Sequence, residues 1–177
     1  MKVNIFLIFM FLLTLGGCNK TEARRAVNLT KVSELNKTIA INKRIFLEEQ
    51  NLIKKYIELD STLAYINSGK GFWYAYLIKN DNSVKPIRGD NIVFEQELIG
   101  LDGTILYTKK DLGLRSYVVD KEHIIKGLKE GLKIMGEKEE IKFIFSSFVA
   151  YRMNGDASGR IGSNEPIISK IKLITIN

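Results

Sequence analysis

The sequence predicts an α+β fold in which an antiparallel, twisted β-sheet wraps around one central helix, with a helical extension before it. Three observations support this fold class. Short segments with apolar, aromatic and β-branched residues recur between turn signals, as antiparallel strands do. Between two of them, residues 120–135 place apolar residues at helical spacing. A second amphipathic segment, 44–60, precedes all of these strands.

The first residues have the pattern of a secretory signal peptide. Lys2 supplies a positive charge, and the apolar run 3–13 is too short to span a bilayer permanently. The sequence LGGC at 15–18 resembles a bacterial lipobox, which implies cleavage before Cys18 and its acylation. We therefore expect a lipoprotein signal peptide at 1–17 and a lipid-anchored protein of the cell envelope, facing the periplasm. The alternatives are an ordinary signal peptide and an N-terminal membrane helix.

The net charge and the cysteine content bear on nucleic-acid binding and on disulfide bonds. The formal net charge is +7, and it falls to +6 without residues 1–17, which contain one lysine and no acid. No block of lysine and arginine has the density of a nucleic-acid-binding surface. Cys18 is the only cysteine, so no disulfide can form within one chain and the fold must depend on its apolar core.

The part of the chain after Cys18 begins with two expected segments. Residues 18–43 are polar and are interpreted as a tether, and residues 44–83 as an extension made of the helix 44–60 and a hairpin. GFWYAYLI at 71–78 has strand composition, and the turn sequence NDNS follows it. Its aromatic residues favour packing between strands over a ligand-binding wall.

Residues 84–177 contain the remaining elements. Four further strands are expected, at 92–100, 105–108, 139–147 and 166–176. Asp102 and Gly103 predict a hairpin between the first two. Asp120 and Glu122 stand where carboxylates favour a helix start, so the central helix is expected over 120–135.

The order of these elements coincides with specific motifs. The segment HIIKGLKEGLKIMGEKEEIKFIFSSFVAY, 123–151, is similar to the central signature of FKBP-type peptidyl-prolyl cis-trans isomerases. The matching residues are Ile124, Ile125, Gly127, Gly131, Gly136, Glu137, Ala150 and Tyr151. Flanking segments at 86–104 and 160–176 resemble the entry, hairpin, flap and last strand of that family. The resemblance covers residues 84–177, and the lipobox with a helical extension is most like the gliding-motility-associated lipoproteins of Bacteroidetes.

This resemblance implies an enzyme that assists the folding of proline-containing exported polypeptides. An X-Pro bond rotates over a barrier of about 20 kcal/mol because the amide must lose its resonance. Its catalysis requires an apolar pocket and a few hydrogen-bond donors that favour the twisted amide, and it requires no cofactor or metal. The same fold with an inactive pocket would instead be a binding module or chaperone in an envelope assembly.

The resemblance also assigns roles to individual residues. Tyr151 and Ile125 are the catalytic candidates: the tyrosine hydroxyl and the Ile125 backbone N–H would each hold a substrate carbonyl. Ile124 would line the pocket and Ile161 would belong to the flap. The alternative interpretation for Ile124, Ile125 and Tyr151 is plain core packing. His123, the only histidine, is expected at the surface near the helix start.

Several pocket positions depart from the family pattern. Leu128 stands at the position of the pocket-floor tryptophan, and Leu106 and Tyr107 at that of a Phe-Asp pair. Ser169 replaces an aromatic residue of the last strand, and Gln96 falls near the position of a tyrosine. By their positions, Leu128, Leu106 and Tyr107 are still substrate-binding candidates. A pocket with these residues offers a proline ring less apolar surface than the family pattern does. These departures predict low activity on simple proline peptides and weak binding of macrolide-type inhibitors.

One loop has the spacing of a calcium site. In 154–165, oxygen-bearing side chains, a glycine and a glutamate stand at EF-hand positions: Asn154, Asp156, Ser158, Gly159 and Glu165. An EF-hand requires a helix on each side, whereas strands are expected here. The spacing alone supports a third hypothesis, a calcium-dependent adhesion protein. Because the flanking helices are not expected, we expect no metal.

Overall fold

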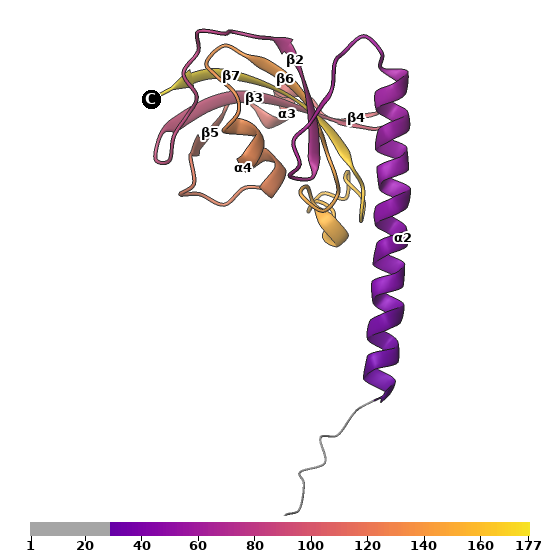
Figure 1. The fold of residues 1–177 in the computed structure, drawn as a ribbon. Coiled ribbons are helices and arrows are strands. Elements are labelled where there is room, and N and C mark those ends of the chain that lie inside the picture. The colour runs from indigo at the N-terminus through magenta and orange to yellow at the C-terminus, as the bar shows by residue number, and fades with distance from the viewer. Residues whose placement is uncertain (1–28) are drawn as a thin grey trace, which may run out of the picture. The chain divides into compact units, whose positions relative to one another are not determined.

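A computed structural model describes residues 29–177 (Figure 1). The predicted signal peptide 1–17 and the predicted lipidation of Cys18 lie outside these residues. The chain divides into a unit that ends at Thr38 and a compact unit from Ile39 to Asn177, and the contacts given below all lie in the second unit. Within 29–177, no helix has the length and apolar character needed to cross a membrane.

The first described element is α2, a helix of 31 residues from Leu29 to Leu59. It includes residues 44–59 of the predicted helix 44–60 but begins 15 residues earlier, so the predicted tether 18–43 is helical from Leu29 onward. The segment 29–43 contains neither glycine nor proline, and most of its residues tolerate a helix, which explains the longer helix.

Residues 29–177 form one sheet of seven antiparallel strands, in the order β1-β2-β6-β7-β3-β4, with β5 paired to β3. The strands are β1 Ile66–Asn67, β2 Phe72–Ile78, β3 Asn91–Gly100, β4 Ile105–Tyr107, β5 Arg115–Val118, β6 Glu140–Phe145 and β7 Ile167–Ile176. The helices after α2 are α3 Lys109–Leu112, α4 Lys126–Leu132 and a 3-10 turn, Arg152–Asn154. The α+β fold class is confirmed, and so is the hairpin between β3 and β4.

Two local predictions were wrong, and one strand was not predicted. No strand follows the turn after β2, because β2 pairs with β1 on one side and β6 on the other instead of forming a hairpin at 80–83. The central helix begins at Lys126 rather than near Asp120, whose φ of 59° lies outside the helical region. β5 had no counterpart in the prediction, because four residues paired to a distant strand leave little local signal.

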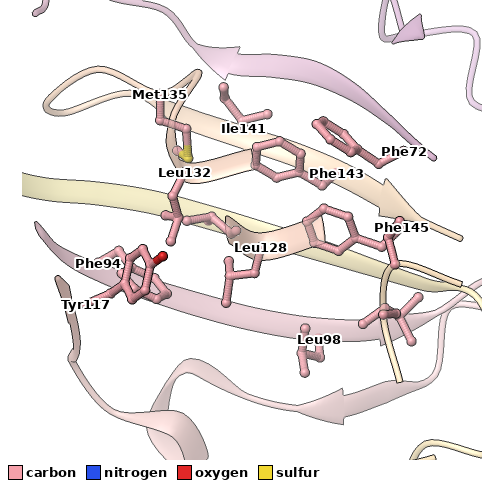
Figure 2. Packing of buried hydrophobic residues seen from close by; sticks show 14 of the residues in the cluster. Phe72, Phe94, Leu98, Tyr117, Leu128, Leu132, Met135, Ile141, Phe143 and Phe145 are labelled. Atoms are coloured by element: carbon pink, nitrogen blue, oxygen red, sulfur yellow. The ribbon is translucent and has the colours of Figure 1, made fainter. Parts of the chain in front are cut away.

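One face of the sheet packs against α4 (Figure 1). Figure 2 shows Leu128 and Leu132 of α4 in the same buried cluster as Phe143 and Phe145 of β6. The glycines of α4 allow this close approach: a Cβ added to Gly127 would lie 2.5 Å from Phe145 Cδ1, and one on Gly131 would lie 3.0 Å from Phe143 Cε1. The backbone of α4 therefore packs directly against the phenylalanine rings of β6.

Aromatic side chains of β2 pack across the strands, as expected. The Phe72 ring lies 5.8 Å from that of Phe143 and 5.7 Å from that of Phe145, both edge to face. Such contacts stabilise aromatic pairs beyond the area that they bury. Trp73 of the same strand instead lines a separate pocket beside α2.

The opposite face packs against the second half of α2. Ile53 is fully buried in a small apolar cluster with Ile99, Ile144 and Ile168. Beside this cluster, the buried carboxylate of Glu49 accepts hydrogen bonds from the backbone N–H of Ser147 at 2.5 Å and from its hydroxyl at 2.6 Å. α2 is thus joined to the turn that follows β6.

Candidate active site

A pocket of about 420 Å³ opens beside the start of α4. It is lined by seven residues from β3, β5, α4 and the segments around α4 and after β6: Gln96, Arg115, His123, Ile124, Ile125, Leu128 and Tyr151. The lining is apolar on the α4 side and polar on the side of β3 and β5. No aspartate or glutamate is among these residues.

Four of the predicted site residues line this pocket, and three do not. Ile124, Ile125, Leu128 and Tyr151 come together, although Tyr151 is distant from the others in sequence. Leu106, Tyr107 and Ile161 lie outside the lining: Ile161 is buried in the core, and Tyr107 contacts the loop 152–165. The roles assigned to these residues stay a prediction.

Ile125 is the residue immediately before α4, and its φ of −57° and ψ of 142° are extended. Within residues 29–177 its backbone N–H has no hydrogen-bond partner. The N–H of Gly127, two residues further on, donates to the Val149 carbonyl at 2.8 Å. This bond holds the start of α4 against the turn that carries Tyr151, and it leaves the Ile125 N–H available for a ligand carbonyl.

Tyr151 ends a tight turn after β6. Backbone bonds from Ala150 N to Ser146 O at 3.0 Å and from Arg152 N to Ser147 O at 2.9 Å define this turn. The Tyr151 hydroxyl has no hydrogen-bond partner within the described chain. Burial raises the pKa of this hydroxyl, and the positive charge of Arg115 opposes that rise. The hydroxyl is therefore protonated at neutral pH and can donate to a carbonyl.

The opposite wall of the pocket is polar and was only partly anticipated. Gln96 is 1% exposed, and its Nε2 donates to the Ser169 hydroxyl at 2.9 Å. Arg115 Nη1 donates to Gln96 Oε1, and its guanidinium lies over the Phe94 ring at 5.3 Å from the centroid. Gln96 and Ser169 had been recognised as departures, whereas Arg115 was missed because it begins a short strand without a motif.

The loop with calcium-like spacing is closed by its own hydrogen bonds. Asp156 accepts from the Ser158 hydroxyl at 2.6 Å, from the Tyr107 hydroxyl and from the Ile161 N–H at 2.8 Å, and these bonds lower its pKa. Glu165 accepts from the Gly162 N–H at 2.6 Å. The loop joins β6 and β7, so strands flank it, and residues 29–177 contain no group of three metal-ligating side chains.

Comparison with known proteins gives the family. The family model described as "FKBP-type peptidyl-prolyl cis-trans isomerase" matches residues 82–174, a little more than half of the chain. One curated relative, the "Probable FKBP-type peptidyl-prolyl cis-trans isomerase FkpA" of Neisseria meningitidis serogroup B (strain ATCC BAA-335 / MC58), is 29% identical over 100 residues. That match covers 56% of this chain and 36% of the relative, so the chain matches about a third of the relative's length. The chain therefore belongs to the family of FKBP-type peptidyl-prolyl cis-trans isomerases.

Proposed function

We propose that the chain catalyses cis-trans isomerisation of X-Pro bonds in the pocket beside α4. One observation supports this most directly: two hydrogen-bond donors without partners in residues 29–177, the Tyr151 hydroxyl and the Ile125 N–H, border the same pocket, whose α4 side is apolar. Sparse donors next to an apolar surface are what amide rotation requires, because no bond is broken and no proton is transferred.

The proposed mechanism depends on how the pocket holds a twisted amide. The proline ring would rest on Ile124 and Leu128, which supply the apolar surface. The Tyr151 hydroxyl and the Ile125 N–H would each donate to a substrate carbonyl and hold the chain on either side of the rotating bond. Leu128 offers less area than an aromatic ring, so we expect a slow enzyme on short peptides.

We also propose that acylated Cys18 anchors the chain to an envelope membrane, where exported polypeptides that contain proline are the clients. The lipobox-like sequence at 15–18 supports the anchor. The resemblance to gliding-motility-associated lipoproteins supports a client in gliding-motility or secretion machinery. Metabolic labelling with a fatty acid would test the anchor, since Cys18→Ser should remove the label from the full chain.

Exchange NMR on a short X-Pro peptide would test the activity. We expect the full chain to accelerate cis-trans exchange, and Tyr151→Phe to reduce the acceleration by about tenfold, as loss of one hydrogen bond in the transition state would do. Because the Tyr151 hydroxyl has no partner in the described chain, this variant should keep its stability. Tyr76→Phe removes a hydroxyl outside the pocket and should leave the rate unchanged.

A second candidate function is a binding module or chaperone without isomerase activity. The polar wall formed by Gln96, Arg115 and Ser169 favours it, because Gln96 and Ser169 stand where the resemblance places aromatic residues. Exchange at the uncatalysed rate, with peptide-induced shifts in the folded protein, would reject the isomerase and support this candidate.

A further inference from the structure

Arg115 is a positive charge in the pocket wall without an acidic partner. Ion pairs within residues 29–177 join eleven pairs of side chains, and none of them includes Arg115. The pocket lining contains no carboxylate either. A partly buried guanidinium is normally paired, because burial removes part of its hydration.

The guanidinium is held in place by neutral groups. Its Nη1 donates to Gln96 Oε1, and the amide of Gln96 is in turn fixed by the donation of its Nε2 to Ser169 at 2.9 Å. The Phe94 ring supports the guanidinium from the side of the core. Burial lowers the pKa of Arg115, yet arginine stays protonated in proteins, so the charge persists.

This arrangement leaves donors for a ligand. A guanidinium has five N–H bonds, and within the described residues Arg115 uses Nη1 on Gln96. The neighbouring lining residue Tyr151 contributes a hydroxyl, and Ile124 and Leu128 contribute apolar surface. A ligand that fits this wall carries an anionic oxygen pair beside an apolar ring.

We propose that the pocket selects a carboxylate next to proline, and that Arg115 is the residue that determines this specificity. The inference rests on the proposed function, because it takes the pocket to be the site that receives proline. The carboxylate is either the side chain of a neighbouring aspartate or glutamate, or the chain-terminal carboxylate of proline. In both cases it supplies the anion that the pocket lacks, in a site partly shielded from water.

Binding of three matched peptides to the full chain tests this proposal. The peptides are acetyl-Ala-Glu-Pro-Ala-amide, its glutamine counterpart and acetyl-Ala-Gln-Pro with a free carboxyl end. We expect one of the two carboxylate peptides to bind about tenfold more tightly than the neutral peptide, a preference that added salt reduces. Whichever carboxylate peptide binds more tightly identifies the source of the carboxylate, a side chain or the chain terminus.

Variants then assign the preference to one side chain. Arg115→Gln should abolish it, and Arg115→Lys, which keeps the charge but loses the two-pronged geometry, should retain only part of it. Arg88→Gln makes the same charge change at an exposed residue outside the pocket and should leave the preference intact. The lysine variant also serves as the test if the glutamine variant is unfolded.

The outcomes separate this inference from the proposed function. Equal affinity for all three peptides, or a preference that survives in Arg115→Gln, would overturn the carboxylate inference even when X-Pro exchange is catalysed. A preference that the unmodified chain shows and Arg115→Gln loses supports the inference. If the unmodified chain shows this preference but does not accelerate X-Pro exchange, only the isomerase proposal is rejected.

Discussion

The two faces of the sheet are covered by different chemistry. The α4 face packs phenylalanine, leucine and methionine side chains against two helical glycines, whereas the α2 face combines four buried isoleucines with buried or partly buried polar pairs. The first face depends on shape and contact area, and the second on whether each polar group keeps its partner. Substitutions should therefore affect the two faces by different amounts and for different reasons.

The largest effect is expected on the α4 face. Phe143 is fully buried, its ring is 5.3 Å from that of Phe145, and it lies against Gly131. Phe143→Ala should lower the free energy of unfolding by about 3–5 kcal/mol, because it removes contacts and leaves a cavity. Denaturant unfolding of the full chain measures this loss. Phe46→Ala, at a 52% exposed position on α2, should cost little, and equal losses would contradict the comparison.

An intermediate effect is expected where α2 meets the turn after β6. Glu49→Ala leaves the buried N–H and hydroxyl of Ser147 without their acceptor. The free energy of unfolding should fall by about 1–3 kcal/mol, the usual cost of unsatisfied buried donors. Glu48→Ala is the matched control, since that side chain is exposed and, within residues 29–177, forms an ion pair only with Arg44. If both variants unfold at the same denaturant concentration, the Glu49 contact does not stabilise the fold.

The smallest effect is expected for Asp60, whose carboxylate lies 2.6 Å from Lys142 Nζ on the α2 face. The hydrogen bond from Lys142 lowers the pKa of Asp60 below its ordinary value of 3.8, despite burial that raises it. The folded state then binds fewer protons than the unfolded state near this pH. The stabilisation is therefore present above pH 3.8 and is lost as pH falls further.

Asp60→Asn tests this dependence. Near neutral pH the wild-type chain should be more stable than the variant by about 1 kcal/mol, and the difference should shrink below pH 3.8. Unfolding by denaturant at several pH values measures it. A difference that stays constant down to pH 2 would show that the carboxylate charge does not contribute.

The parts of the fold that were predictable are those with local signals. Asp102 and Gly103 specify the hairpin between β3 and β4, since a two-residue turn signal and its flanking strands are adjacent in the sequence. Alternation placed the apolar face of β6 correctly, and it also indicated β7. The pairing of β2 with β6 was not predictable in this way, because its partners are about 70 residues apart.

The residues of the candidate site likewise fall into those that the sequence identified and those that it did not. Ile124, Ile125, Leu128 and Tyr151 were found because they stand in a family-like motif, and the structure brings them to one pocket. The bond between Gln96 and Ser169 joins residues that are 73 positions apart, so the sequence showed two departures but not that they pair. Arg115 could be recognised only from its place in the pocket.

The pairing of β2 with β6 determines which fragments of the chain can be produced without aggregation. β2 lies before residue 82, so a fragment limited to the family-matched segment 82–174 would expose the backbone N–H and C=O groups along one side of β6. It would also uncover Ile144 and Ile168, which α2 covers in the whole chain. Such an unpaired, apolar edge is a template for aggregation. A fragment that resists aggregation must therefore begin before Glu49.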